Sequence, residues 1–364
     1  MEKGKISSFQ MAIMMYPTIV ATAILGVPSV TAKYAQNDLW LSPIFASLIG
    51  YVTVYITYKL HKFYPDQTVI QFSEQIIGRL GGKILGFMFM LFYIQITGVM
   101  IKQYAEFVVD SFLINTPIIV IVASMVALCA FVARGGLEGL GRAAQLFFPI
   151  FIFPLLIAII FVFPDFEFKN IFPILGDGIL PPLKGSIVPG GWFTEFFLIT
   201  FLLPFLADKK KGMKYGMLSV FAVMITLVMV NIVVLFVLGA TTPTKVYPLM
   251  SVARYISFSD FFEHMESIVM AIWVVGAFIK ISVCYYATAL GTAQWLNLSD
   301  YRLVVFPLGI LLVEFSFWSL PNTIELSRYN VGVFPPFGLM MQTIIPLFLL
   351  VIAVVRKRKK GTDN

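Results

Sequence analysis

The residues of this chain that could do chemistry are ionisable side chains inside long apolar stretches. Lys280 lies in the middle of an apolar segment at about 267–293, and Glu195 lies in another at about 187–207. An unpaired ammonium inside a membrane would cost several kcal/mol, so Lys280 requires a partner or a function. Lys280 and Glu195 are therefore candidates for ion or proton coupling. A structural pair of Lys280 with Glu195 or Glu314 is the alternative.

A second pair of opposite charges lies in the segment at about 84–108. Lys102 and Glu106 are four residues apart, which places them on one face of a helix. Each charge lowers the cost of burying the other, so we expect a structural ion pair.

Four hydroxyl-bearing side chains form one-turn pairs in two apolar segments. Tyr93 and Thr97 are one pair, and Ser282 and Tyr286 are the other. Such hydroxyls could hydrogen-bond a small zwitterionic solute, although hydrogen bonds between helices would explain them as well. All four are candidate ligand-binding residues.

Two apolar segments carry Pro and Gly together at matching places. These are Leu25-Gly-Val-Pro28 and Val188-Pro-Gly-Gly191. Pro removes a backbone donor and Gly relaxes the backbone, so we expect both helices to be broken there. Matched interruptions of this kind mark transporter substrate sites, whereas a simple kink is the alternative at either one. The resulting ligand-binding candidates are Ile24, Leu25, Gly26, Pro189, Gly190 and Gly191.

The elements that must position these residues are long apolar helices. Of 364 residues, 59% are hydrophobic and 12% are charged, against roughly 45–50% and 25% in soluble domains. An apolar run of about 18 residues can cross a bilayer. We expect an all-α integral membrane protein with about ten transmembrane helices, near 9–32, 39–58, 84–108, 117–133, 143–163, 187–207, 215–240, 267–293, 303–320 and 335–355.

The order of these helices predicts an internal repeat. Shorter amphipathic pieces at 64–82 and 244–266 occupy equivalent places in the two halves, and the two Pro–Gly interruptions begin each half. We therefore expect an inverted repeat of five plus five helices, at about 9–163 and 187–356, within one transmembrane domain, 1–364. Most of the 26 Lys and Arg fall in loops on the side that carries both termini, which predicts cytoplasmic termini.

Other kinds of chemistry find little support. Cys129 and Cys284 both lie in apolar segments, and two histidines offer no ligand cluster, so we expect no metal and no disulfide. Hydrolase, kinase and metalloprotease motifs are absent from the sequence, so neither an enzymatic activity nor a cofactor is expected. The net charge of +7 lies in short loops beside apolar runs, which indicates contact with the lipid bilayer rather than with nucleic acid.

Seven stretches spread over nearly the whole sequence carry a family resemblance. They are Lys5-Ile-Ser-Ser-Phe-Gln10, Leu25-Gly-Val-Pro-Ser29, Tyr34-Ala-Gln-Asn-Asp-Leu-Trp40, Gly135-Gly-Leu-Glu-Gly139, Asn170-Ile-Phe-Pro-Ile-Leu-Gly-Asp-Gly178, Leu202-Leu-Pro-Phe-Leu206 and Ala271-Ile-Trp-Val-Val-Gly-Ala-Phe-Ile-Lys280. In these stretches the chain resembles the spore germination permeases, which are the B subunits of germinant receptors.

This resemblance implies a LeuT-like fold of the amino acid–polyamine–organocation superfamily in the inner membrane of a bacterial endospore. It also implies a small nutrient as ligand, an A subunit and a C-subunit lipoprotein as partners, and germination as the outcome. The expected function is nutrient sensing, with an amino acid as the first choice of ligand. The alternatives are an amino-acid/proton symporter that works alone, with Lys280 or Glu195 cycling protons, and a scaffold subunit that binds no solute.

Overall fold

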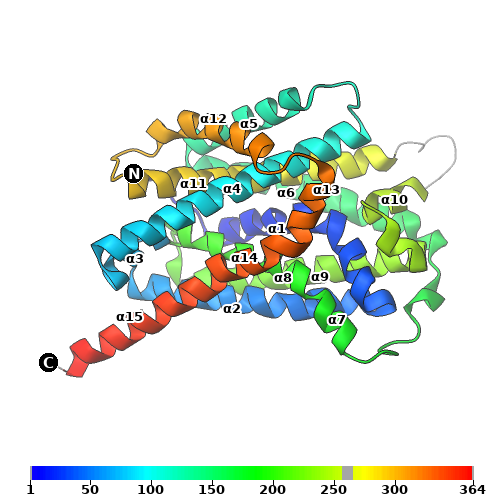
Figure 1. Ribbon diagram of the computed structural model, residues 1–364, viewed down its shortest axis with the longest axis horizontal. Helices are drawn as coiled ribbons and strands as arrows, with labels where there is room; N and C mark the ends of the chain where they lie inside the picture. The colour runs from blue at the N-terminus through cyan, green and yellow to red at the C-terminus, as the bar shows by residue number, and fades with distance from the viewer. Residues whose placement is uncertain (1, 256–264, 363–364) are drawn as a thin grey trace.

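Long helices run along one axis of the molecule and make up its regular structure. The computed structural model describes residues 2–255 and 265–362, and the elements named in those ranges are all helical. Figure 1 shows that the two ends of the chain lie at the same end of the bundle. This end is called the terminal end below, and the other is called the outer end.

The helices follow the apolar segments predicted from the sequence. The α-helices are α1 (Ser8–Ala35), α2 (Ser42–Phe63), α3 (Val69–Ile77), α4 (Arg79–Ser111), α5 (Ile118–Gly135), α6 (Leu137–Val162), α7 (Leu180–Gly185), α8 (Ile187–Thr194), α9 (Gly212–Leu238), α10 (Pro248–Tyr255), α11 (Met265–Trp295), α12 (Arg302–Trp318), α13 (Thr323–Arg328), α14 (Phe334–Leu339) and α15 (Ile345–Thr362). The 3₁₀ turns are η1 (Gln36–Leu41), η2 (Phe163–Asp165), η3 (Phe168–Ile171), η4 (Glu195–Phe201), η5 (Leu203–Phe205), η6 (Lys209–Lys211) and η7 (Gly239–Thr244), and the π turns are η8 (Tyr329–Val333) and η9 (Met340–Ile344).

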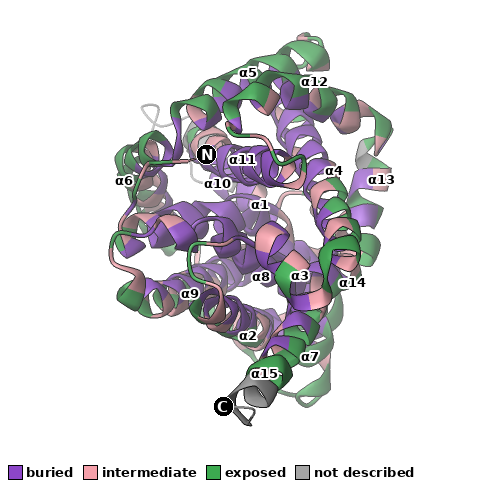
Figure 2. Ribbon diagram, turned by 90° about the vertical axis from the view of Figure 1, so that its left-hand side faces the viewer, coloured by how far each residue is buried: buried purple, intermediate pink, exposed green. Residues whose placement is uncertain are grey.

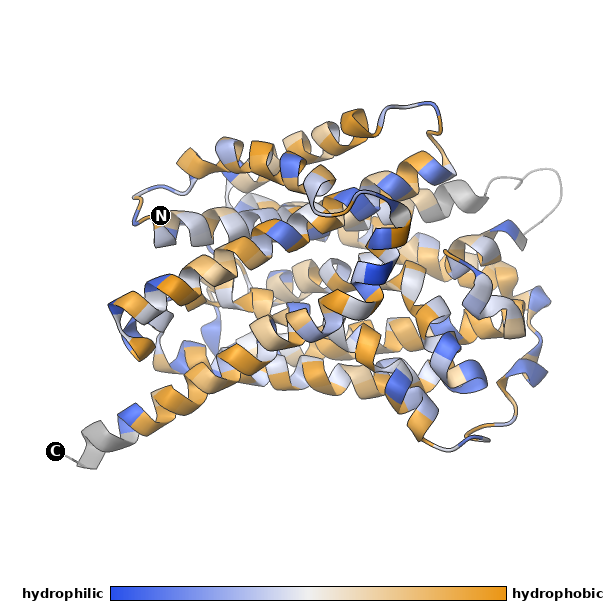
Figure 3. Cartoon of the chain, in the orientation of Figure 1, coloured by the Kyte–Doolittle hydropathy of each residue, from blue (hydrophilic) through white to orange (hydrophobic). Residues whose placement is uncertain are grey.

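Each of the ten predicted segments is helical in this structure. Among the described residues, seven helical stretches are long and apolar enough to cross a bilayer, and the first of them, Ser8–Phe63, contains both α1 and α2. Two predicted segments fall outside these stretches. The helix α12 has only 17 residues, and the segment at 187–207 is divided between α8 and η4. Figure 3 shows apolar residues over the long helices and hydrophilic ones mainly at the ends and loops.

Burial differs sharply between the helices. The most apolar window of Ser8–Phe63 is 94% buried, whereas that of Leu137–Asp165 is 17% buried. Figure 2 accordingly shows α1 among buried residues at the centre of the bundle and exposed residues on α5, α6 and α12 at its edge. The helix α1 packs against α9, α11 and α6. It is therefore the central element, and α6 presents most of its apolar surface outward, as a lipid-facing helix does.

The first helix does not unwind at its Pro–Gly stretch. The helix α1 is continuous from Ser8 to Ala35 with Pro17 and Pro28 inside it. Pro28 has no backbone N–H, so the carbonyl of Ile24 loses its donor four residues later. Packing on three neighbouring helices keeps the rest of the stretch helical. The predicted break in this helix is therefore absent, and only local backbone pairing is lost.

The second Pro–Gly stretch packs closely, and the helix changes only after it. Residues Ile187–Thr194 form an α-helix, which tightens into the 3₁₀ turn η4 at Glu195. A Cβ on Gly190 would lie 2.7 Å from Cδ1 of Ile49, and one on Gly191 would lie 2.8 Å from Cα of Pro335. These glycines therefore allow α8 to approach α2 and α14, because no side chain would fit between them.

An N-terminal strap, residues Glu2–Ser8, crosses the terminal end of the bundle. The Ile6 amide donates to the carbonyl of Phe205 at 3.1 Å, and the Ala207 amide donates to the carbonyl of Ile6 at 2.9 Å. The Ser8 amide then donates to Oδ1 of Asp208 at 2.7 Å. The strap therefore fastens the beginning of α1 to the segment that follows η5.

The Glu2 carboxylate anchors this strap to three further elements. It accepts hydrogen bonds from the amides of Gly4 (2.7 Å) and Leu137 (2.9 Å) and from the hydroxyls of Tyr286 (3.3 Å) and Tyr301 (3.2 Å). Burial alone would raise the pKa of Glu2, but the hydrogen bonds from Gly4 and Leu137 help to lower it below its ordinary value. The carboxylate therefore ties α6, α11 and the beginning of α12 together.

We expect Glu2→Gln to lower the free energy of unfolding by about 1–3 kcal/mol at neutral pH, because a carboxamide cannot accept on both of its polar atoms. The folded-state pKa is depressed, so this stabilisation is present above the ordinary glutamate pKa and is lost as pH falls through the folded value. The difference between wild type and variant should therefore shrink on acidification. Thermal unfolding of the detergent-solubilised protein at several pH values measures it.

The matched control is Glu138→Gln on the neighbouring α6. The Glu138 carboxylate pairs with Arg142 on the surface, with side chains 49% and 74% exposed. Such a pair contributes only about 0–1 kcal/mol. Equal losses in the two variants would contradict an anchoring role for Glu2.

Candidate functional site

A buried ion pair lies at the centre of the bundle. The Nζ of Lys280 on α11 donates to Oε2 of Glu195 at 2.7 Å and to Oγ1 of Thr22 on α1 at 2.8 Å. Both charged side chains are 1% exposed. Of the two partners considered from the sequence, Glu195 is the one in contact, whereas Glu314 is exposed on α12. The charge of Lys280 is therefore neutralised by a residue 85 positions away in the chain.

Trp192 completes this network from α8. Its indole Nε1 donates to Oγ1 of Thr22 at 2.9 Å, so the Thr22 hydroxyl accepts hydrogen bonds from both Trp192 and Lys280. Between Trp192 and Glu195 the backbone changes from α-helix to the 3₁₀ turn η4. Side chains of α1, α8 and α11 thus meet at the Thr22 hydroxyl, and Glu195 of η4 joins them through Lys280. None of the four can move alone without losing a buried hydrogen bond.

A small inner cavity touches the ion pair. Its volume is about 20 Å³, and Thr22, Trp192, Glu195 and Lys280 contribute to its lining. A cavity needs about 10–15 Å³ of this kind of volume to hold one water. The inner cavity therefore has room for about one water molecule beside the charges, and a nutrient-sized solute does not fit there in this conformation.

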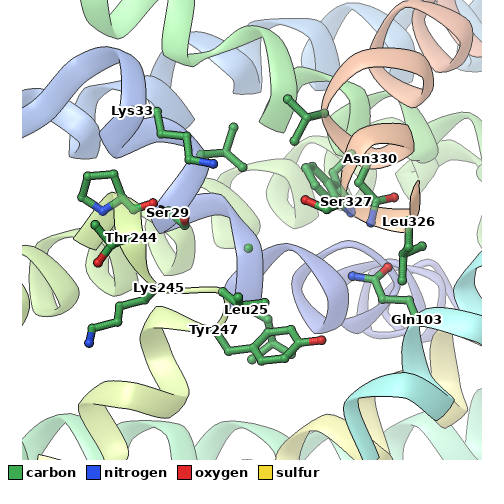
Figure 4. Close-up of a pocket in the computed structure, with 16 residues that line it drawn as sticks. Leu25, Ser29, Lys33, Gln103, Thr244, Lys245, Tyr247, Leu326, Ser327 and Asn330 are labelled. Atoms are coloured by element: carbon green, nitrogen blue, oxygen red, sulfur yellow. Dashed lines mark hydrogen bonds between the residues drawn. The ribbon is translucent and has the colours of Figure 1, made fainter. Parts of the chain in front are cut away.

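A larger outer cavity lies above the inner one. Its volume is about 190 Å³, and it shares Gln103, Trp192 and Asn330 with the inner cavity. Figure 4 shows the carboxamides of Gln103 and Asn330 facing the same part of this cavity. Pockets for drug-sized ligands span about 300–1,000 Å³, so this volume suits a smaller solute. The full lining is Leu25, Gly26, Ser29, Val30, Lys33, Gln103, Trp192, Pro243, Thr244, Lys245, Val246, Tyr247, Leu326, Ser327, Asn330 and Val331.

Three of the predicted ligand-binding residues on α1 lie at or beside the outer cavity. Leu25 and Gly26 line it, and Ile24 is buried next to them. No neighbouring atom lies within 4 Å of the position that a Cβ on Gly26 would occupy. Gly26 therefore leaves open space that a larger side chain would fill.

The predicted residues on α8 do not line either cavity. Pro189, Gly190 and Gly191 are buried in the contacts of α8 with α2 and α14. A substitution at Gly190 would press on Ile49, so it would disturb packing before it affected a ligand. The residue of α8 that reaches both cavities is Trp192, one position later.

The hydroxyl pair on α4 is engaged within the bundle. Tyr93 donates to Oε1 of Gln342 at 3.3 Å, and Thr97 donates to the carbonyl of Tyr93 at 2.6 Å. Neither residue lines the two cavities, whereas Gln103 on the same helix lines both. The residue that α4 contributes to the site is therefore Gln103, which lies nearer the outer end than Tyr93 and Thr97 do.

The hydroxyl pair on α11 also points elsewhere. Tyr286 donates to Glu2 of the strap at the terminal end, and Ser282 lies beside Cys129 of α5. Both side chains belong to contacts between elements, and neither lines the outer or the inner cavity. Lys280 is the residue of α11 that reaches the site.

The predicted ion pair on α4 forms. Nζ of Lys102 lies 3.4 Å from Oε1 of Glu106, with side chains 8% and 7% exposed. The ammonium also lies over the ring of Phe317, 5.5 Å from its centre. The pair holds α4 against α12, directly beside Gln103 of the cavity.

Thr22, Gln103 and Asn330 are site residues that the sequence reasoning missed. Each is a polar residue next to an apolar run, and Thr22 precedes Gly26 by four residues, on the same helical face. That spacing could have singled out Thr22. Asn330 lies in a π turn between α13 and α14, and nothing in its local sequence indicates that it faces α4.

Two solved structures share this fold. A substrate-bound, outward-open Na⁺-coupled sialic acid symporter matches 93% of this chain and 78% of its own, with a TM-score of 0.67 and 13% identity. Mhp1, a nucleobase-cation-symport-1 family transporter in a closed conformation with bromovinylhydantoin bound, has the same coverage and TM-score at 7% identity. These likenesses establish a LeuT-like transporter fold and nothing finer.

The sequence itself matches one family. The family model described as spore germination protein matches residues 5–324. Spore germination protein KB of Bacillus subtilis (strain 168) is 26% identical over 99% of this chain and 97% of its own length. With the apolar helices, these matches identify a multi-pass membrane protein related to permeases.

We expect Glu195→Gln to lower the free energy of unfolding by about 3–5 kcal/mol, because it leaves the Lys280 charge buried without a counter-charge. The double variant Glu195→Gln/Lys280→Met should recover most of this loss, since no net charge then remains at the site. Thermal unfolding of all four proteins, including Lys280→Met alone, gives the coupling energy. Strictly additive losses would show that the two side chains do not neutralise each other.

Proposed function

The chain belongs to the spore germination protein family, and we propose that it is the nutrient-sensing B subunit of a spore germinant receptor. Its ligand is a small solute, with an amino acid as the first choice, held in the outer cavity. It acts with an A and a C subunit in the inner membrane of the spore. Its chain ends lie in the cytoplasm, and the outer cavity faces away from it.

The observation that carries this proposal is the outer cavity and its connection, through the inner cavity, to the Lys280–Glu195 pair. The cavity is about 190 Å³ in volume and narrows at Gln103, Trp192 and Asn330. Below that point the inner cavity reaches the Lys280–Glu195 pair. An open cavity in contact with a buried charged network is an arrangement in which a bound solute can influence the packing of several helices.

The proposed mechanism is a shift between two arrangements of the bundle. Elements α1, α4 and α8 line both cavities, and α11 lines the inner one through Lys280. A solute that contacts them favours the arrangement it fits better, and it can shift the equilibrium only by its difference in affinity for the two. The A and C subunits would respond to that shift and start germination.

We expect Gly26→Trp to abolish solute binding, because an indole would fill the open space beside Gly26. Gly26→Ala is the matched control and should bind normally, since a Cβ there meets no neighbouring atom within 4 Å. Thermal-shift screening of the purified protein with amino acids, nucleosides and sugars provides the readout. A ligand at 100 times its dissociation constant adds about 2.7 kcal/mol of stability. A ligand that still stabilises Gly26→Trp would place the site elsewhere.

A second candidate function is amino-acid/proton symport without partners. The buried Lys280–Glu195 pair favours it, because intramembrane ion pairs occur in proton relays of transporters. Uptake of a labelled ligand into proteoliposomes separates the two functions. Uptake driven by a proton gradient would favour the symporter, and binding without uptake would favour the receptor. A protein that assembles with its partners but responds to no solute would instead be a scaffold.

A further inference from the structure

The charge around the outer cavity is one-sided. Its lining includes two lysines, Lys33 and Lys245, and none of the sixteen residues drawn in Figure 4 is acidic. The ion pair below it carries one charge of each sign and adds no net charge. A solute that enters the cavity therefore meets lining groups that are positive or neutral.

The two lysines hold different positions. Lys33 lies in the last turn of α1, one turn after Ser29, and Figure 4 shows its side chain pointing toward the middle of the cavity. Lys245 follows η7, and its side chain extends away from the other labelled residues. No described residue forms an ion pair with either lysine. Lys33 is therefore placed to contact a bound anion, and Lys245 is placed to attract one at the rim.

Carboxylates are close to one wall but do not line the cavity. Burial, followed by the charges of Asp110 and Glu106, raises the pKa of Tyr247 above its ordinary value, so both carboxylates lie near that ring. Glu106 is already paired with Lys102. Tyr247 itself contributes to the lining, whereas Asp110 and Glu106 do not. The charge presented to a solute is thus set mainly by the lysines.

Backbone donors do not replace the lysines. A solute carboxylate could bind free amides at an unwound helix, but α1 remains helical through Gly26 and Pro28. Its amides in that stretch are therefore used within the helix. The carboxamides of Gln103 and Asn330 are neutral and can donate or accept. Lys33 is the group that distinguishes an anionic solute from a neutral one.

We propose that the outer cavity selects solutes that carry a carboxylate or another anionic group, with Lys33 as the recognising cation and Lys245 as an attracting charge at the rim. The proposal rests on the outer cavity as the solute site. Charge-assisted hydrogen bonds from an ammonium to a carboxylate are roughly twice as strong as neutral ones. Clefts with one sign of charge also concentrate ions of the other sign.

The test needs no knowledge of the natural ligand. Cys129 and Cys284 are both 0% exposed, so a thiol placed in the cavity by Ser29→Cys reports alone. Its modification rate is measured in the full-length protein with an anionic and a cationic methanethiosulfonate reagent and divided by the rates of each with 2-mercaptoethanol. We expect the anionic reagent to be favoured by about five- to tenfold at low salt, and by less at high salt.

Substitution of the lysines identifies the source of this preference. Lys33→Gln should remove most of it, and Lys245→Gln should remove a smaller part, because its side chain points away. Lys184→Gln is the matched control, since Lys184 is an exposed lysine of α7 that does not line the cavity. Compared at 0.1 M salt, it should leave the preference within about twofold, because exposed charges are screened over about 10 Å there.

Two outcomes would overturn the proposal. One is equal reactivity of the two reagents in the Ser29→Cys protein, and the other is an anionic preference that survives Lys33→Gln. Ser327→Cys on α13 provides a second reporter in the same cavity, should the first variant fail to fold. No nutrient is present in these measurements, so a negative result would contradict anion selectivity but not solute binding in the cavity. Conversely, a ligand screen without a hit would count against the proposed function but not against the measured anion preference.

Discussion

The burial of one ammonium group constrains much of this structure. The Lys280 side chain is only 1% exposed, so its counter-charge has to come from within the chain. Glu195 provides that charge from the point where α8 changes to the 3₁₀ turn η4, and Thr22 brings α1 to the same place. The relative positions of three elements distant in sequence thus follow from one requirement for neutrality.

The apolar runs were sufficient to predict the helices, because an interior without water requires backbone groups to pair within each helix. They were insufficient to predict the state of α1, since Pro28 can remain in a helix that tight packing supports. Lys280 could be recognised as a residue in need of a partner. That its partner is Glu195 and not Glu314 could not be predicted, because helical periodicity shows which residues share a face but not which helix that face meets.

The same limit explains the candidate site. Gly26 was predicted from its helix-breaking neighbours and does line the outer cavity, although through open space rather than free amides. Tyr93 and Tyr286 had suitable hydroxyls but contact Gln342 and Glu2 instead. The carboxamide of Asn330 comes from the far end of the sequence, where only the tertiary fold brings it beside α4. Contacts of this kind are a property of helix packing and not of local composition.

The N-terminal strap and the outer cavity lie at opposite ends of α1. This helix has 28 residues, which corresponds to about 42 Å at 1.5 Å per residue. Its outer half carries Gly26 and Lys33 of the cavity, and its other end continues into the strap. If the helix moves as a rigid body, a displacement at the cavity must also displace its contacts at the opposite face. Information could therefore cross the membrane through α1 even if no solute does.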